Sequence, residues 1–132
     1  MSNIRLFADR IGHPSRFCIQ FLRLNKIPFE EVHVSLLKGE TRDHPDLPFG
    51  QVPVMKTADN LTITQSTSIL RYLADTNPQI PDQMFPKSPE KKVKVNEFMD
   101  FFHFSMNAVS YSFLISKLYA KEYIVIVSAN IT

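Results

Sequence analysis

The sequence predicts an α/β fold, in which a strand–helix–strand unit is followed by a hairpin and a helix and then by a further helical segment. The main observation is the spacing of apolar residues, which alternates between strand-like runs and helix-like steps of three and four in that order. A hydrophobic content of 44% suits a packed soluble core. With nine Pro and only three Gly, the turns are set largely by proline.

The first 36 residues predict the strand–helix–strand unit. Residues 4–8, "IRLFA", form a short apolar run typical of a buried strand, and Gly12 and Pro14 interrupt it. Residues 15–25 then carry an apolar helical stripe: Phe17, Cys18, Phe21, Leu22 and Leu24. Val32, Val34 and Leu36 alternate with polar residues, which predicts a second strand. Two strands joined through a helix are expected to be parallel.

The next segment predicts a hairpin and a helix. Residues 38–48 are polar, charged and broken by proline, so we expect a loop there. Residues 54–56 and 61–63 form a hairpin that turns at 58–60, and 65–74 form a helix with apolar positions at steps of three and four. A βαβ unit followed by ββα is the thioredoxin-like plan, which we assign to residues 1–78.

Beyond a proline-rich linker, residues 79–88, the pattern predicts a long helix. Ser88 suits the N-cap, and Pro89 suits the first helical position. The apolar stripe runs through Val95, Phe98, Phe102, Met106, Val109 and Phe113. We expect this helix to end near Tyr119, and the β-branched "EYIVIVSANIT" to form a strand or a frayed tail. Residues 89–132 are thus assigned to a helical segment with an atypical tail.

Charge and cysteine content exclude several classes of protein. The formal net charge is +2, with basic and acidic residues interspersed, so we expect no nucleic-acid partner. No apolar stretch is long enough to cross a bilayer, and we expect no membrane partner and no metal site. Cys18, the single cysteine, cannot form an internal disulfide, which favours a cytoplasmic location. It lies on the apolar helical stripe, which favours a core thiol over a nucleophile.

Two short motifs indicate a binding site. In "FGQVPVM", Pro53 interrupts a strand pattern, which predicts an edge, a bulge or a turn into the strand. In "TQS", Gln65 and Ser66 begin a helix, whose N-terminal N–H groups favour an anion. Thr64 would serve equally as a simple helix cap.

Together, "GQVPVM", "LTITQSTSILRYLA" and "HPSRFCIQFLRLNKIPFEEVHVSLLKGE" resemble the N-terminal domain of cytosolic glutathione transferases, most of all the theta class in an insect-like form. The resemblance runs from residue 4 to about residue 104. It implies a cis bond between Val52 and Pro53, with the main chain of Val52 pairing with the cysteinyl part of glutathione. It also implies that Ser66 binds the γ-glutamyl carboxylate and that Gln65 holds the amino end.

The catalytic position departs from the family. The theta class stabilises the glutathione thiolate with a serine hydroxyl just after the first strand, and "GHPSR" places Gly12 there. Ser15 is the substitute candidate, although a first-turn serine is also an ordinary structural choice. His13 offers a proton site near pH 7 or is simply solvated. Arg16 matches the family pattern, and a structural pairing with acidic groups near the helix start is as expected as a functional role.

Two further departures concern the ends of the site. Thr41 stands where the family brings a His or Lys to the glycine end of glutathione, with Lys38, Arg42 and His44 as basic candidates nearby. The family's all-helical C-terminal domain, which carries the electrophile pocket, is represented only by its first helix, so the chain resembles a truncated member.

These observations predict a glutathione transferase-like protein, with glutathione as co-substrate and small electrophiles as partners. Detoxification and a homodimer, favoured by the apolar stripe of the long helix, belong to the same prediction. The alternative is a non-catalytic glutathione-binding or interaction module. A third class, a redox enzyme that uses Cys18, is weakened by the absence of a CxxC pair.

Overall fold

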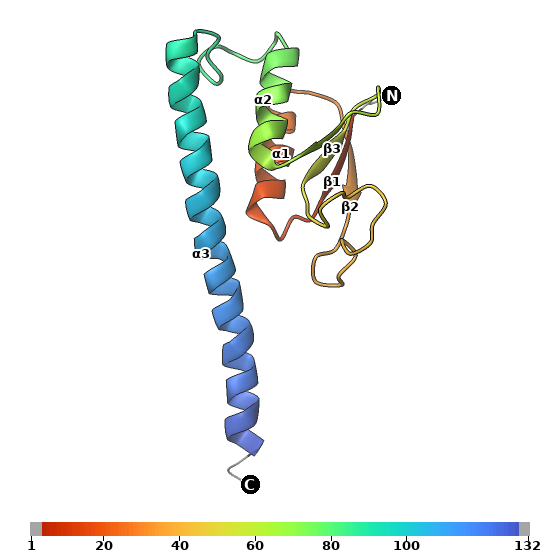
Figure 1. The fold of residues 1–132 in the computed structure, drawn as a ribbon, viewed down its shortest axis with the longest axis vertical. Coiled ribbons are helices and arrows are strands. Elements are labelled where there is room, and N and C mark those ends of the chain that lie inside the picture. Colours follow the sequence, from red (N-terminus) through yellow and green to blue (C-terminus); the bar gives the residue numbers. More distant parts are fainter. Residues whose placement is uncertain (1–3, 130–132) are drawn as a thin grey trace. The chain divides into compact units, whose positions relative to one another are not determined.

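The computed structural model describes residues 4–129, and of residues 110, 111 and 113–129 it describes the backbone alone. The chain divides into two compact units, Met1–Lys92 and Val93–Thr132. In the first unit, helices α1 (His13–Leu24) and α2 (Ser66–Thr76) lie on the same face of a four-stranded sheet (Figure 1). The strands are β1 (Arg5–Ala8), β2 (Glu30–His33), β3 (Val54–Lys56) and β4 (Thr62–Thr64). The thioredoxin-like arrangement predicted from the sequence is confirmed.

The sheet has the strand order β2-β1-β3-β4. β1 is parallel to β2 and antiparallel to β3, and β3 is antiparallel to β4. Phe7 of β1 pairs with Val54, which in turn pairs with Thr64. Because of this register, four chain segments meet at one end of the sheet: those that follow β1, β2 and β4 and the one that precedes β3.

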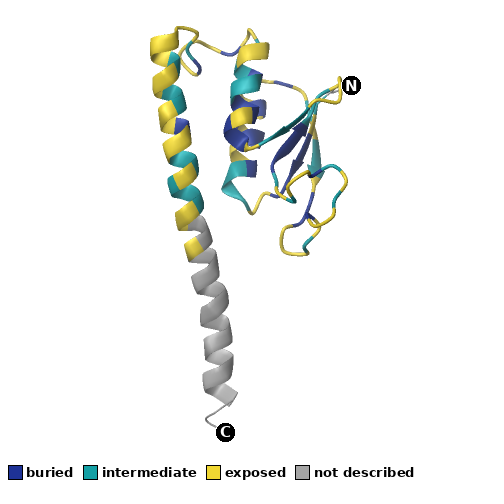
Figure 2. Cartoon of the chain, viewed as in Figure 1, coloured by how far each residue is buried: buried dark blue, intermediate teal, exposed yellow. Residues whose placement is uncertain are grey.

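Both faces of the sheet are covered by apolar side chains. Successive residues of a strand point to opposite faces, so Leu6 and Phe7 belong to different layers. On the helical face, Cys18 and Leu22 of α1 and Ile69 of α2 are completely buried. The other face carries a cluster that contains no helical residue: Phe7, Val34, Leu47 and Val54. The buried residues of the strands and of α1 and α2 form the interior of this unit (Figure 2). The segment 38–53 therefore covers the second face of the sheet through Leu47.

The second strand is shorter than the alternating pattern predicted. β2 ends at His33, although the amide N–H of Val34 still donates to the carbonyl of Ala8 at 3.0 Å, and the chain leaves the ladder after that residue. The carboxylate of Glu40 accepts the amide N–H of Ser35 at 2.7 Å, and that of Asp9 accepts the amide N–H of Leu36 at 2.8 Å. Side-chain acceptors thus take the place of a neighbouring strand, and the prediction of a strand to residue 36 was wrong.

The hairpin and the first helix are close to their predicted bounds. β4 begins at Thr62, one residue later than expected, and α1 begins at His13, two residues earlier. Segment 38–48 forms turns, as predicted.

Helix α3 (Pro89–Ala129) is longer than predicted. Its N-cap is confirmed, because the hydroxyl of Ser88 accepts the amide N–H of Lys91 at 3.4 Å. The prediction of a strand or frayed tail was wrong for residues 122–129, which are helical, while residues 130–132 lie outside the described part. β-Branched residues lower helix propensity by only a few tenths of a kcal/mol each, so their presence did not decide the conformation. Within the second unit, the rings of Phe98 and Phe102 stack at 5.9 Å, one helical turn apart.

Candidate functional site at the carboxyl ends of β1 and β2

The end of the sheet where four segments meet carries most of the residues singled out in the sequence. Gly12 follows β1, Val52 and Pro53 precede β3, and Gln65 and Ser66 follow β4. The register of the strands brings these three groups to the same edge. Ligands of open α/β sheets bind beyond the carboxyl ends of the parallel strands, so this edge is the candidate site.

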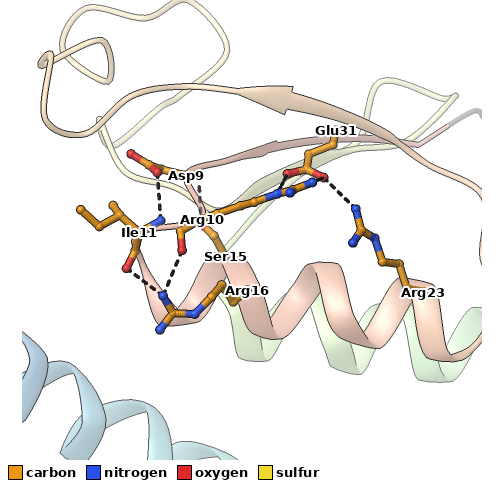
Figure 3. A network of polar contacts seen from close by, with 7 residues as sticks. All are labelled: Asp9, Arg10, Ile11, Ser15, Arg16, Arg23 and Glu31. Atoms are coloured by element: carbon orange, nitrogen blue, oxygen red, sulfur yellow. Dashed lines mark hydrogen bonds and ion pairs between the residues drawn. The ribbon is translucent and has the colours of Figure 1, made fainter.

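The corner between β1 and α1 is fixed by its own hydrogen bonds. The main-chain N–H of Gly12 donates to the carbonyl of Asp9 at 3.1 Å, and the N–H of Ile11 donates to the Asp9 carboxylate at 3.0 Å. Arg16 reaches back from α1 and donates to the carbonyls of Arg10 and Ile11 at 3.0 and 3.2 Å (Figure 3). Arg16 therefore binds main-chain carbonyls of this corner and stabilises its backbone conformation.

Gly12 leaves room for a side chain. Its φ of −80° and ψ of 128° are extended values that any residue adopts. A Cβ atom there would lie 3.6 Å from the carbonyl oxygen of Asp9 and 3.9 Å from Cδ1 of Leu36, which are ordinary contacts. The glycine is therefore not required by the backbone, and its consequence is chemical, because residue 12 itself supplies no hydroxyl.

Ser15 lies behind the corner. Its side chain is 1% exposed, and its Oγ accepts the main-chain N–H of Asp9 at 3.3 Å (Figure 3). A hydroxyl that is buried and engaged by the backbone is poorly placed to contact a ligand. This geometry argues against the expected catalytic role of Ser15 and favours a structural one.

The segment before β3 presents its main chain to the same edge. The Val52–Pro53 peptide bond is cis, as expected. The side chain of Val52 packs against the cluster around Phe7, and Pro53 is buried. Within residues 4–129, no hydrogen bond engages the N–H or C=O of Val52. Polar main-chain groups of this kind are normally satisfied by water or by a ligand.

The start of α2 has an unusual backbone. Gln65 is the N-cap residue, with φ 67° and ψ 123°, and its side chain is exposed and makes no capping hydrogen bond. Thr64 is the last residue of β4, so the alternative in which it caps the helix is not supported. A non-glycine residue at positive φ costs about 1–3 kcal/mol and is concentrated at functional sites. Ser66, next in the chain, is buried.

Cys18 faces the protein interior. It is completely buried, and its thiol lies 3.9 Å from the main-chain oxygen of Ser66. Burial raises the pKa of this thiol far above its usual value, so it stays protonated at neutral pH. Among the described residues, no group of three His, Cys, Asp or Glu side chains gathers as metal ligands.

The loop after β2 carries Thr41 and the basic candidates. Thr41 is 7% exposed, so its side chain lies mostly inside the loop. The His44 ring packs edge-on against Phe7 at 5.7 Å, and its Nδ1 accepts the amide N–H of Asp46 at 3.1 Å. Lys38 and Arg42 are exposed, so they remain the basic candidates of this loop.

Sequence reasoning missed Asp9, whose carboxylate organises the corner. The residue is 6% exposed and accepts N–H groups from two segments. The available signal was an acidic residue directly after a buried strand. Arg10 and Glu31, which form a paired contact between the ends of β1 and β2, were also missed.

Comparison with known proteins places the first unit among relatives of one family. Residues 15–76 match the family described as "Glutathione S-transferase, N-terminal domain". Glutathione S-transferase T1 of Arabidopsis thaliana is 33% identical over 106 residues, which are 78% of this chain and 43% of that protein. Human glutathione S-transferase theta-2 is 32% identical over 99 residues, 73% of this chain and 40% of that protein.

Solved structures similar to this chain include members of the same family. Human glutathione S-transferase T1-1 in its apo form superposes with a TM-score of 0.69 at 31% identity, over 76% of this chain and 42% of that one. Human glutathione transferase theta-2, solved in complex with glutathione, gives a TM-score of 0.68 at 30% identity, over 75% and 41%. The chain thus spans less than half the length of these relatives. In the part of the chain that the structure describes, no helix is both long and apolar enough to span a membrane.

Proposed function

Because residues 15–76 place this chain in the glutathione S-transferase family, next to its theta class, we propose that its first unit binds glutathione and presents the thiolate to small electrophiles. The observation that carries the proposal is the main chain of Val52, which has no partner within residues 4–129 and lies at the same edge as the start of α2. An extended tripeptide is a suitable partner, because it pairs with exposed strand-like main chain as an added strand would.

The proposal assigns the parts of glutathione as follows. The cysteinyl unit pairs with the N–H and C=O of Val52, and its sulfur lies next to Gly12. The γ-glutamyl carboxylate lies at the N-terminus of α2, with the hydroxyl of Ser66 as donor and the amide of Gln65 on the amino end. A carboxylate is favoured there because the helix dipole is positive at that end. The glycine end lies toward the loop after β2, where Lys38 and Arg42 supply positive charge.

The proposed reaction is a nucleophilic substitution. The thiol proton passes to solvent, the sulfur lone pair forms a bond to the carbon of the electrophile, and a halide leaves with the bonding electrons. Free thiols have a pKa of about 8.5, so a transferase must stabilise the thiolate to react at neutral pH. Gly12 supplies no hydroxyl for this, which makes thiolate stabilisation the weakest part of the site.

A second candidate function follows from that glycine. Without a donor at position 12, the first unit would bind glutathione without activating it, as a non-catalytic binding module. Turnover of a halogenated substrate such as a benzyl halide distinguishes the two: a transferase releases halide at a rate that depends on the protein, and a binding module does not. The cytoplasmic location, a role in detoxification and a homodimer remain predictions of the resemblance.

The binding step is tested by titrating the chain with glutathione in a calorimeter. The double variant Gln65→Ala/Ser66→Ala should bind at least tenfold more weakly, since hydrogen bonds to charged groups contribute about 1.5–3 kcal/mol each. A control, Ser68→Ala, changes an exposed serine of the same helix and should bind as the parent does. Equal affinity of the parent and the double variant would show that the start of α2 is not the site.

A further inference from the structure

We propose that Asp9 is a positioning residue, which holds the loop after β1 and the loop after β2 in one arrangement. Asp9 would thereby raise the affinity of the site for glutathione, whose sulfur lies at the first loop and whose glycine end lies at the second. The inference rests on the proposed function for its ligand. It rests on the structure alone for the connection between the two loops.

The connection is made by the two oxygens of one carboxylate. Oδ1 accepts the amide N–H of Ile11 at 3.0 Å, and Oδ2 accepts the amide N–H of Leu36 at 2.8 Å. The first lies in the corner that contains Gly12, and the second begins the segment that leads to Thr41. The two donors are separated by α1 and β2 in the sequence, so the carboxylate joins segments that no continuous element connects.

The main chain of Asp9 adds two contacts on the corner side. Its carbonyl accepts the N–H of Gly12 at 3.1 Å, and its N–H donates to the buried hydroxyl of Ser15 at 3.3 Å. Asp9 therefore fixes the corner through three groups and the loop after β2 through one. Because Oδ2 provides the contact to Leu36, removing this acceptor should release the second loop while the corner keeps its main-chain bonds.

Burial makes the two carboxylate contacts effective. Asp9 is 6% exposed, so water competes little for its oxygens. The side chain of Leu36 also lies near the corner, with its Cδ1 atom 3.9 Å from the position that a Cβ of residue 12 would take. The loop after β2 thus contacts the corner beside the place proposed for the sulfur. A displacement of this loop would therefore change the surroundings of the sulfur.

The first test does not involve glutathione. Asp9→Asn keeps the size of the side chain but has one acceptor oxygen, so one of the two N–H groups loses its partner. We expect amide hydrogen exchange of the residue that loses its acceptor, Ile11 or Leu36, to become at least tenfold faster, while the exchange of Met55 in β3, which reports on global unfolding, changes less. The control, Asp59→Asn, makes the same chemical change at an exposed turn and should leave Ile11 and Leu36 unaffected. If the exchange of both amides rose only in proportion to that of Met55, the proposal would be overturned, since Asp9 would then merely support overall stability.

The second test compares two ligands by calorimetry. γ-Glutamylcysteine lacks the glycine, so it does not reach the loop after β2. We expect Asp9→Asn to weaken glutathione binding by about tenfold and γ-glutamylcysteine binding by clearly less, whereas general destabilisation would weaken both equally. Equal losses, or none, would overturn the positioning role in binding. A parent chain that binds neither ligand would instead refute the proposed function, and the exchange measurement would still decide whether Asp9 couples the loops. Should Asp9→Asn fail to fold, Asp9→Glu, which displaces both oxygens by one methylene, takes its place with the same expected ratio.

Discussion

Arg10 and Glu31 form a bidentate ion pair that joins the loop after β1 to β2. Nε of Arg10 lies 2.6 Å from Oε1 of Glu31, and Nη2 lies 2.8 Å from Oε2 (Figure 3). Arg23 of α1 approaches the same carboxylate at 3.4 Å. The hydrogen bonds from Arg10 lower the pKa of Glu31 below its usual value of 4.5.

This pair predicts a pH-dependent contribution to stability. Since the pKa of Glu31 is lower in the folded chain than in the unfolded chain, the stabilisation is fully present above the unfolded value and is lost as the pH falls through the folded value. Glu31→Gln should lower the free energy of unfolding at pH 7 by about 0.5–1 kcal/mol. The loss is this small because Arg10 is largely exposed, so that water and salt screen the ion pair. Urea unfolding at a series of pH values should show this difference shrinking below pH 4.5. The control is Glu30→Gln, whose carboxylate has one contact, at 3.5 Å from Arg5. A difference that persists unchanged in acid would contradict the prediction.

Gly12→Ser should lower the pKa of the bound glutathione thiol. A Cβ fits at this position at ordinary contact distances, so the backbone need not move to accept it. We expect a fall of about one pKa unit, equivalent to about 1.4 kcal/mol. The measurement is the ultraviolet absorbance of the bound thiolate against pH. Gly12→Ala is the matched control, because it adds the carbon without the donor. A variant that binds glutathione with an unchanged thiol pKa would mean that residue 12 does not face the sulfur.

Gly50→Ala should destabilise the chain more than Gly39→Ala does. Both glycines have a positive φ, 59° and 70°, where an L-residue costs about 1–2 kcal/mol. Only at Gly50 would the new Cβ meet a neighbour, the carbonyl oxygen of Thr41 at 3.3 Å, whereas nothing lies within 4 Å at Gly39. Chemical denaturation of both variants measures the difference. Equal losses would show that the loop yields at Thr41 without cost.

Gln65→Gly should separate stability from binding. Glycine tolerates the positive φ of this N-cap residue. The free energy of unfolding of the variant should therefore equal that of the parent or exceed it by up to about 1 kcal/mol, as measured by denaturant unfolding. Gln65→Ala keeps the backbone cost and should not be stabilised. Both variants lack the amide and should bind glutathione more weakly. If Gln65→Gly lost stability, the backbone conformation of residue 65 would have to be determined by the glutamine side chain.

Cys18 should react slowly with thiol reagents in the folded chain. Its thiol is completely buried and its pKa is raised by that burial, so reaction requires local or global opening. With Ellman's reagent at pH 8, we expect labelling at least about a hundredfold slower than in denaturant. Rapid labelling of the folded protein would revive a redox role for this cysteine.

The pattern of apolar residues predicted β1 and α1 well, because the burial of apolar side chains determines each of these elements. The apolar runs of β1 and α1 lie within one element each, so their periodicity was sufficient to place them. The end of β2 could not be predicted, because it depends on carboxylates of Asp9 and Glu40 that become neighbours only after folding.

The candidate site was predicted unevenly for the same reason. The motifs around Pro53 and Gln65 are each continuous in sequence, and the pairing of β3 with β4 brings them to one edge. The burial of Ser15 and of Thr41 depends on packing between distant segments, so sequence spacing alone could not reveal it.

The position of β1 in the sheet also constrains how the chain folds. Arg5 pairs with Glu30 on one side and with Lys56 on the other, so the strand that is synthesised first must wait for both partners. Both pairings of β1 require closing a long stretch of chain, whereas β3 and β4 pair locally as a hairpin. The entropy of these two long closures slows folding relative to a helical protein of the same size. On the ribosome, the apolar residues of β1 emerge well before β3 and depend meanwhile on transient cover, which makes this early interval the one in which aggregation competes with folding.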